Sequence, residues 1–194
     1  MTNPMKRLTD ERGVSLTELM LTLAVAAIVT GMAAALTADS RRASQGDGAM
    51  RLVMAELNAA RETAITQRRV VEVQFLGGMW IKTIRHEVVN NQTTVLHTVA
   101  LEGNVQFSLV PNVPDTPDAF GNTGAVYFGA AQSIQFNGDG ALVDSGGTPV
   151  NGTVFLSFMQ KAITARAVTV LGSTGRVRGY KWISNSSGSG WNRV

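Results

Sequence analysis

The chain has 194 residues, 44% hydrophobic and 16% charged, which allows one ordinary domain plus an anchoring segment and excludes a wholly disordered chain. The formal net charge of +3 is too small to indicate nucleic-acid binding from charge alone. The chain has no cysteine, which excludes disulfides, thiolate metal sites and a cysteine nucleophile.

The N-terminal segment is basic and leads into an apolar run that contains a single acid near its start. Gly13 is followed by Val14-Ser15-Leu16-Thr17-Glu18, and the next charge is Asp39. As a helix, residues 19–36 would extend about 27 Å, close to the thickness of a bilayer core. A carboxylate near the mouth of such a helix costs about 2.5–3.5 kcal/mol if it is fully buried and somewhat less near the interface. Glu18 is therefore a candidate functional residue.

A conventional signal peptide is the alternative interpretation of this segment. Residues 1–12 have the composition of a basic n-region, and Ala33-Ala34-Ala35 matches a signal-peptidase site. However, the apolar run exceeds the usual h-region of about 7–15 residues, and Glu18 would interrupt it. We therefore favour a retained anchor. In either case the positive flank stays in the cytoplasm and the remainder is exported.

The next segment has an amphipathic helical pattern. Apolar side chains recur there at spacings of three and four: Met50, Val53, Met54, Leu57, Ala60, Ala64 and Ile65. We predict one long helix from Val14 to Gln67. Its weakest part is Gln45-Gly46-Asp47-Gly48, where the helix is expected to bend or loosen, because each interior glycine costs about 1 kcal/mol relative to alanine.

From Val70 onward the pattern changes to that of strands. Val70–Leu76 and Met79–Arg85 flank Gly77-Gly78, which is a two-residue hairpin signal. Further strands are predicted over 93–101, 105–110, 126–128, 133–136, 153–159, 165–171 and 176–183. Residues 111–124 are predicted to form a long surface loop, and 184–190 a mobile stretch. The expected fold class is α+β: a long helix packed on an antiparallel β head.

The residues around Gly13 resemble the class III leader of type IV pilins and type II secretion pseudopilins. In those families a prepilin peptidase cuts after the glycine, the new N-terminus is methylated and the glutamate at the fifth position is retained. The resemblance implies cleavage between Gly13 and Val14, with Val14 in the place of the usual methylated Phe. It also implies that Glu18 neutralises the N-terminal amine of a neighbouring subunit. The alternative is a glutamate tolerated near the interface by snorkelling or protonation.

The remainder resembles the GspH/FimT branch of this superfamily in three places. Ala55–Ile65, with its Ala-Arg-x-x-Ala-Ile run, is similar to the branch's helix end, and Ile134–Gly140 to its central strand and glycine turn. Residues 167–178 resemble its closing strand with a Gly-Arg-x-Arg signature. The resemblance implies a pilin-like fold with a GspH-like β-sandwich head.

This resemblance sets the functional expectation. We expect a leader at 1–13, a transmembrane and filament-core helix at 14–38, its amphipathic continuation at 39–69 and the head at 70–194. The chain would be a minor pilin or pseudopilin with one pass through a bacterial inner membrane and its head in the periplasm. It would then join a type IV pilus or a type II secretion pseudopilus. The implied partners are the prepilin peptidase and other pilins, bound through the N-terminal helix; no enzymatic activity and no cofactor are expected.

The C-terminal region is basic. After Asp144 the chain carries six cations and no acid: Lys161, Arg166, Arg176, Arg178, Lys181 and Arg193. Strand alternation places Arg176 and Arg178 on one face with Tyr180, and Tyr180 and Trp182 are expected to be available for stacking on bases. FimT-like members that bind DNA for uptake use this arginine motif. The resemblance therefore makes Arg176 and Arg178 candidate DNA contacts, and Lys181 in the same basic tail is a further candidate.

Other patterns favour ordinary structural roles. The same arginine motif also suits a closing edge strand whose charges prevent edge-to-edge aggregation. Asn137, Asp139 and Asp144 do not have the spacing of a calcium loop and are interpreted as turn residues. His86 and His97 do not form a paired metal motif and are expected on sheet surfaces. No Gly-x-Ser-x-Gly elbow is present.

Overall fold

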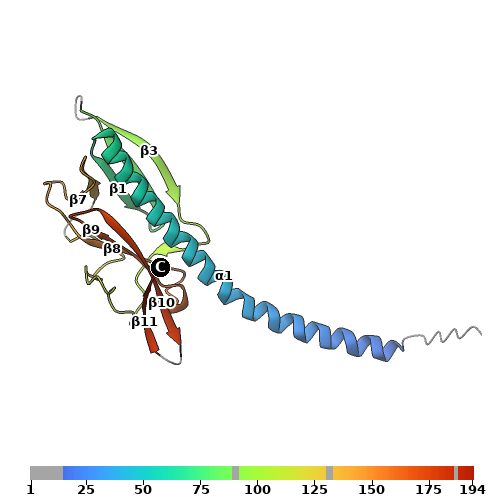
Figure 1. Cartoon of the computed structure of the whole chain (residues 1–194). Helices are drawn as coiled ribbons and strands as arrows, with labels where there is room; N and C mark the ends of the chain where they lie inside the picture. The colour runs from blue at the N-terminus through green and yellow to red at the C-terminus, as the bar shows by residue number, and fades with distance from the viewer. Residues whose placement is uncertain (1–14, 89–91, 130–132, 186–187) are drawn as a thin grey trace, which may run out of the picture. The chain divides into compact units, whose positions relative to one another are not determined.

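The computed structural model describes residues 15–88, 92–129, 133–185 and 188–194 (Figure 1). The chain divides into two compact units, Met1–Asp39 and Ser40–Val194, and one helix, α1 (Leu16–Gln67), contributes residues to both. All sheet pairings in the second unit are antiparallel. The predicted fold class, a long helix with an antiparallel β head, is confirmed.

Helix α1 ends where the sequence predicts. Arg68 takes a left-handed φ of 48°, and the Arg69 N–H donates to the Ala64 carbonyl at 3.1 Å, which closes the last turn. The predicted first residue, Val14, lies outside the described residues. The predicted apolar stripe is confirmed for five side chains exposed by at most 1%: Met50, Val53, Leu57, Ala60 and Ala64. Met54, also predicted, is partly buried against the same core. Ile65, the last predicted member, is 39% exposed.

The predicted weak point of the helix is instead a point of close contact. The helix is continuous through Gln45–Gly48. A Cβ atom on Gly46 would lie 3.0 Å from the backbone oxygen of Thr164, whereas a Cβ atom on Gly48 would meet nothing within 4 Å. Gly46 is therefore needed for the approach of the Thr164 backbone, and Gly48 is not needed for packing.

The two glycines are expected to respond in opposite ways to alanine. Gly48→Ala should raise the free energy of unfolding by about 1 kcal/mol, because alanine favours a helix interior more than glycine does. Gly46→Ala should lower it by about 1 kcal/mol, because the clash with Thr164 outweighs the same gain. Urea unfolding of the full chain in detergent micelles measures both values. Equal stabilisation by the two substitutions would contradict the packing role of Gly46.

The first sheet has the strand order β3-β2-β1-β6-β7. Its strands are β1 (Val71–Leu76), β2 (Trp80–His86), β3 (Thr93–Ala100), β6 (Ile134–Phe136) and β7 (Leu142–Val143). The predicted β1–β2 hairpin is confirmed, but Leu76 pairs with Trp80, so its loop has three residues rather than two. Gly77 and Gly78 supply φ values of 55° and 78° at the turn. Met79, predicted to begin the second strand, belongs to the loop.

The second sheet has the order β11-β10-β9-β8-β4, with β5 also paired to β8. Its elements are β4 (Gln106–Phe107), β5 (Val126–Tyr127), β8 (Gly152–Ser157), β9 (Arg166–Leu171), β10 (Arg176–Asn185) and β11 (Gly188–Arg193), with a short 3-10 helix η1 (Ala162–Thr164) between β8 and β9. Every residue of β8 is buried. One side of this sheet packs into the main core with α1, and the other packs against Leu109 and Trp191.

The predicted mobile stretch 184–190 is wrong. Strand β10 continues to Asn185, and β11 begins at Gly188 and pairs with it, Trp182 opposite Trp191. Their rings lie 5.4 Å apart, and the Trp191 indole N–H donates to the Pro114 carbonyl at 2.9 Å. The sequence of β11 is rich in glycine and serine and does not look like a strand, because the packing of Trp191 on Trp182 is what holds it in the sheet. The Gly-Arg-x-Arg strand is consequently an inner strand, and β11 is the edge.

Candidate assembly helix and nucleic-acid surface

The structure places Glu18 in the first turn of α1, with its side chain exposed. Gly13 and Val14, the predicted cleavage site, lie outside the described residues. The apolar side chains that follow Glu18 are exposed as well: Leu19, Met20, Leu21, Leu23, Val25, Ile28, Val29 and Met32. Apolar side chains exposed all round a helix suit lipid or a helical bundle.

Among the described residues, one helix is long and apolar enough to cross a bilayer, judged by length and composition. It is α1, and none of its most apolar 18-residue window is buried. The core helix of a soluble protein would have this window largely buried, whereas in α1 the window is exposed.

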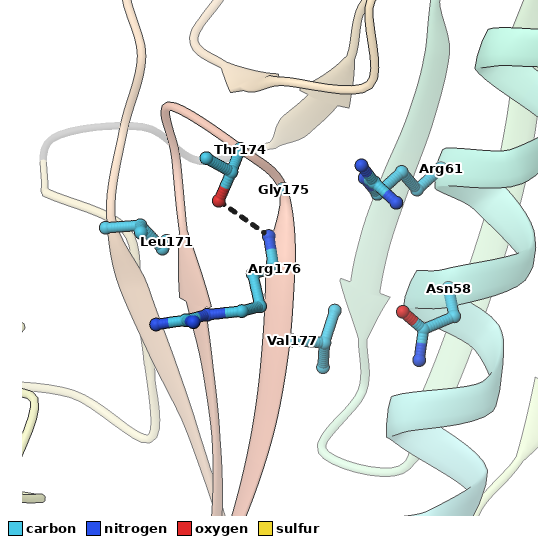
Figure 2. A pocket seen from close by; sticks show the side chains of 7 residues that line it. All are labelled: Asn58, Arg61, Leu171, Thr174, Gly175, Arg176 and Val177. Carbon is cyan, nitrogen blue, oxygen red and sulfur yellow. Dashed lines mark hydrogen bonds between the residues drawn. The ribbon is translucent and has the colours of Figure 1, made fainter.

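Strand β10 presents its two faces to different surroundings. Gly179 faces α1, because a Cβ atom there would lie 2.7 Å from the sulfur of Met54. Arg176 and Val177 point to opposite sides of the strand, with Val177 on the side of the helix (Figure 2). The face that carries Arg176 and Arg178 is therefore turned away from α1, as the alternation predicts.

Arg178 is engaged within the protein. Its guanidinium donates to Asp118 in the 111–124 loop, and the two side chains are 22% and 11% exposed. The same carboxylate accepts from the Tyr180 hydroxyl at 2.9 Å and the Thr169 hydroxyl at 2.6 Å. The pKa of the Tyr180 phenol is raised. Burial is the largest cause, and the Asp118 carboxylate is the second. Asp118 thus fastens the loop to β9 and β10.

Lys181 and Arg166 share a second carboxylate, that of Asp47 on α1. The Arg166 side chain is fully buried and donates its Nε–H to Asp47 at 2.5 Å, while Lys181 Nζ lies 3.4 Å from Asp47. Partial burial raises the pKa of Asp47, but hydrogen bonds and charges from Arg166 and Lys181 outweigh it and hold that pKa below its ordinary 3.8. Sequence reasoning missed both aspartates, because each lies more than 50 residues from its partners.

The turn between β9 and β10 borders a hollow of about 470 Å³ (Figure 2). The residues that line it are Asn58, Arg61, Leu171, Thr174, Gly175, Arg176 and Val177. The Arg176 backbone N–H donates to the Thr174 hydroxyl at 3.4 Å. The Arg176 side chain is exposed, and its guanidinium contacts no carboxylate of the described residues.

The three segments that carry the family resemblance meet at one point near this turn. Arg61 on α1 donates to the Gly140 carbonyl at 3.0 Å. Gly175 has a φ of 61°, and a Cβ atom on it would lie 2.1 Å from the Gly140 oxygen and 2.8 Å from Arg61. The helix end, the glycine turn after β6 and the closing turn are therefore joined by one arginine and two glycines.

A sequence model of the family described as Type II transport protein GspH matches residues 49–175, about two thirds of the chain. The chain belongs to the GspH family. This membership confirms the resemblance seen in the sequence. The match includes Arg61, Gly140 and Gly175, but Glu18 and the cations of β10 lie outside it.

Two solved structures resemble the GspH-family chain, both of the type IV minor pilin FimU of Pseudomonas aeruginosa. The first is 18% identical to this chain. The matched part covers 74% of this chain and 95% of the FimU chain, with a TM-score of 0.47. The second is 17% identical, and the matched part covers 79% of this chain and 96% of the FimU chain, also with a TM-score of 0.47. No curated protein sequence matches the chain.

In this GspH-family chain the aromatic side chains of β10 are buried and are not available for stacking on bases. Tyr180 and Trp182 are only 4% and 8% exposed, so the expectation that they stack on bases is wrong. Three of the six C-terminal cations face carboxylates of the protein. The other three are exposed: Lys161, Arg176 and Arg193. The basic surface is therefore smaller than the sequence suggests.

The remaining polar residues have structural partners in this GspH-family chain. Asn137 accepts backbone N–H groups of its own turn at 2.9 and 3.1 Å, and Asp144 accepts two at 2.9 Å. His86 lies 2.9 Å from a Glu72 oxygen, and His97 contacts Glu56. No three metal-ligating side chains come together within the described part of the chain.

Proposed function

We propose that the chain is a minor pilin or pseudopilin, made as a prepilin and cut between Gly13 and Val14. The retained helix, residues 14–38, anchors the protein in the inner membrane and then enters the core of a type IV pilus or type II secretion pseudopilus. Residues 39–69 continue the helix, and 70–194 form a periplasmic head that meets neighbouring subunits. The observation that carries this proposal is that the apolar N-terminal part of α1 is exposed and has one carboxylate in its first turn, while the same helix continues into a GspH-family head.

Glu18 supplies the assembly contact in this proposal. A carboxylate and a new N-terminal amine attract strongly inside a low-dielectric helical bundle, and a mismatched register would leave both unpaired. Membrane anchoring and filament formation can therefore use the same helix, with the charge pair selecting the register of assembly. The leader would be removed by a prepilin peptidase, which exposes the amine.

Processing and assembly are tested by two measurements on one set of variants. Intact mass of membrane-extracted protein should show loss of residues 1–13 and gain of one methyl group when a prepilin peptidase is present. Glu18→Gln should be processed normally but be absent from sheared filaments, because it keeps the size of the side chain and loses the charge. Thr22→Ala, one turn further along the same helix, is the matched control. Normal incorporation of the Glu18→Gln protein would contradict the proposed pairing.

A DNA-binding minor pilin remains the second candidate, favoured by the exposed Arg176. We propose that duplex DNA would contact Arg176 first, because Arg178 and Lys181 already face Asp118 and Asp47. Arg176→Ala should weaken DNA retention and lower the salt slope by about one unit. Asp118→Asn should strengthen retention if Arg178 also contacts phosphates, because the neutral amide releases its guanidinium. Gel shifts of the detergent-solubilised chain decide this, and no retention at low salt would remove the candidate.

A further inference from the structure

The connection between β8 and β9 exposes large apolar side chains beside a cation. Met159 is 77% exposed and Ile163 is 48% exposed, and the exposed Lys161 lies between them in the sequence. We call residues 158–163 the Met159 loop. Large apolar side chains gathered in one short loop indicate a contact surface more than isolated exposed residues do.

The backbone of the Met159 loop is in an unfavourable conformation. Met159 and Gln160 have φ values of 48° and 54°, and the Lys161 N–H donates to the Phe158 carbonyl at 3.0 Å. This is the pattern of a type I′ turn, which favours asparagine and glycine over bulky side chains. Such outliers persist where the surroundings hold them, and they concentrate at functional contacts.

The surroundings do hold this loop. The buried Thr164 hydroxyl donates to the Lys161 carbonyl at 2.7 Å and accepts the Phe158 N–H at 3.0 Å. The buried Arg166 donates to the Ile163 carbonyl at 3.1 Å and to the Ala43 carbonyl of α1 at 3.1 Å. The loop is therefore a rigid projection fixed to α1 near Ala43.

Cations flank this projection. The Arg42 guanidinium lies 5.7 Å from the centre of the Phe158 ring, and its neighbour Arg41 is exposed. Asp39 is the closest acid before them, and Asp47, the next acid after them, is engaged by Arg166 and Lys181. Exposed apolar side chains beside cations are the chemistry that recognises an anionic lipid surface.

Chain connectivity places this projection within reach of that surface. Ala43 follows Leu36, the last residue of the charge-free run, by seven residues. Seven residues span about 10 Å as helix and at most about 25 Å when extended. Each headgroup layer is about 5–7 Å deep, so a loop fixed near Ala43 lies within a few Å of it, a gap that the long Met159 and Lys161 side chains can cover.

We propose that the Met159 loop docks on the anionic surface of the bilayer that holds the apolar helix. Met159 and Ile163 enter the interface, and the exposed Lys161 and Arg41 contact lipid phosphates. The loop thereby orients the head on the membrane before assembly. This inference rests on the proposed anchoring, and its test separates the two.

The absence of cysteine allows a clean test by single labelling. The full chain with Met159→Cys carries an environment-sensitive fluorophore and is reconstituted in vesicles of phosphatidylcholine with or without phosphatidylglycerol. Quenching is measured with two lipids: one with a nitroxide near its headgroup, for residues 159 and 173, and one with a nitroxide deep in its acyl chain, for residue 25. Ser173→Cys, exposed in the β9–β10 turn, is the control outside the loop, and Val25→Cys reports the span. Quenching is expected at residues 159 and 25, stronger at 159 with phosphatidylglycerol, and not at 173.

Charge variants test the lipid headgroups as the partner. Lys161→Gln and Arg41→Gln should each lower the docked-to-undocked ratio about fivefold in anionic vesicles. Arg176→Gln, at the other end of the head sheet, should leave this ratio unchanged. An unquenched probe at 159 beside a quenched probe at 25 overturns the docking and leaves the anchoring intact. An unquenched probe at 25 overturns both. Protection of residue 159 only in assembled filaments also overturns the docking, because the partner is then another subunit.

Discussion

Asp47→Ala is expected to lower the free energy of unfolding by about 3 kcal/mol, because it leaves a fully buried guanidinium without its counter-ion. Arg166 would keep only backbone carbonyls as partners, those of Ile163, Ala165 and Ala43. The figure lies at the low end for a broken buried pair because the Asp47 side chain is 30% exposed and water can enter its place. Urea unfolding followed by tryptophan fluorescence measures the loss.

A second substitution separates this electrostatic effect from lost packing. Arg166→Met removes the buried charge and retains most of the volume, so the double variant Asp47→Ala, Arg166→Met should be more stable than Asp47→Ala alone. A double variant as unstable as the sum of the single changes would show that the two side chains act independently. Arg176→Met, an exposed arginine on the same sheet, should change stability by less than about 0.5 kcal/mol.

The same contact predicts acid sensitivity. The pKa of Asp47 is lower in the folded chain than its ordinary 3.8, so the contact stabilises the fold fully above about pH 4. That stability is lost as the pH falls through the folded-state value, because the folded carboxyl then takes up its proton. Stability curves between pH 2 and pH 6 should therefore be flatter for the double variant than for the natural chain.

Gly175→Ala is expected to lower the free energy of unfolding by about 3 kcal/mol. A left-handed φ costs an alanine about 1 kcal/mol, and overpacking against fixed backbone costs about 1–3 kcal/mol more. The Cβ atom would lie 2.1 Å from the Gly140 oxygen, which is itself held by Arg61. The closing turn would have to move, and with it the junction of the three family segments.

Gly147→Ala is the matched control for that substitution. Gly147 has a φ of 82°, and a Cβ atom there would meet nothing within 4 Å. It should therefore show the backbone cost of about 1 kcal/mol without the clash. Equal losses for Gly175→Ala and Gly147→Ala in urea unfolding would refute the steric role of the junction.

Periodic patterns were the reliable part of the sequence. The stripe from Met50 to Ala64 and the β1–β2 hairpin were predictable because spacing and glycine chemistry act over a few residues. Strand β11 was not predictable, since Gly188-Ser189-Gly190 has poor strand propensity and the strand is held by the packing of Trp191 on Trp182.

The sequence by itself determined the long helix, its single early acid and the family to which the head belongs, because these depend on residue order over short spans. Only the tertiary structure decided which charges are available at the surface. It pairs Arg178 with Asp118 and Arg166 with Asp47 across distant segments, and it buries Tyr180 and Trp182. A buried charge is costly unless the fold places an opposite charge beside it, and that partner can come from any distance along the sequence.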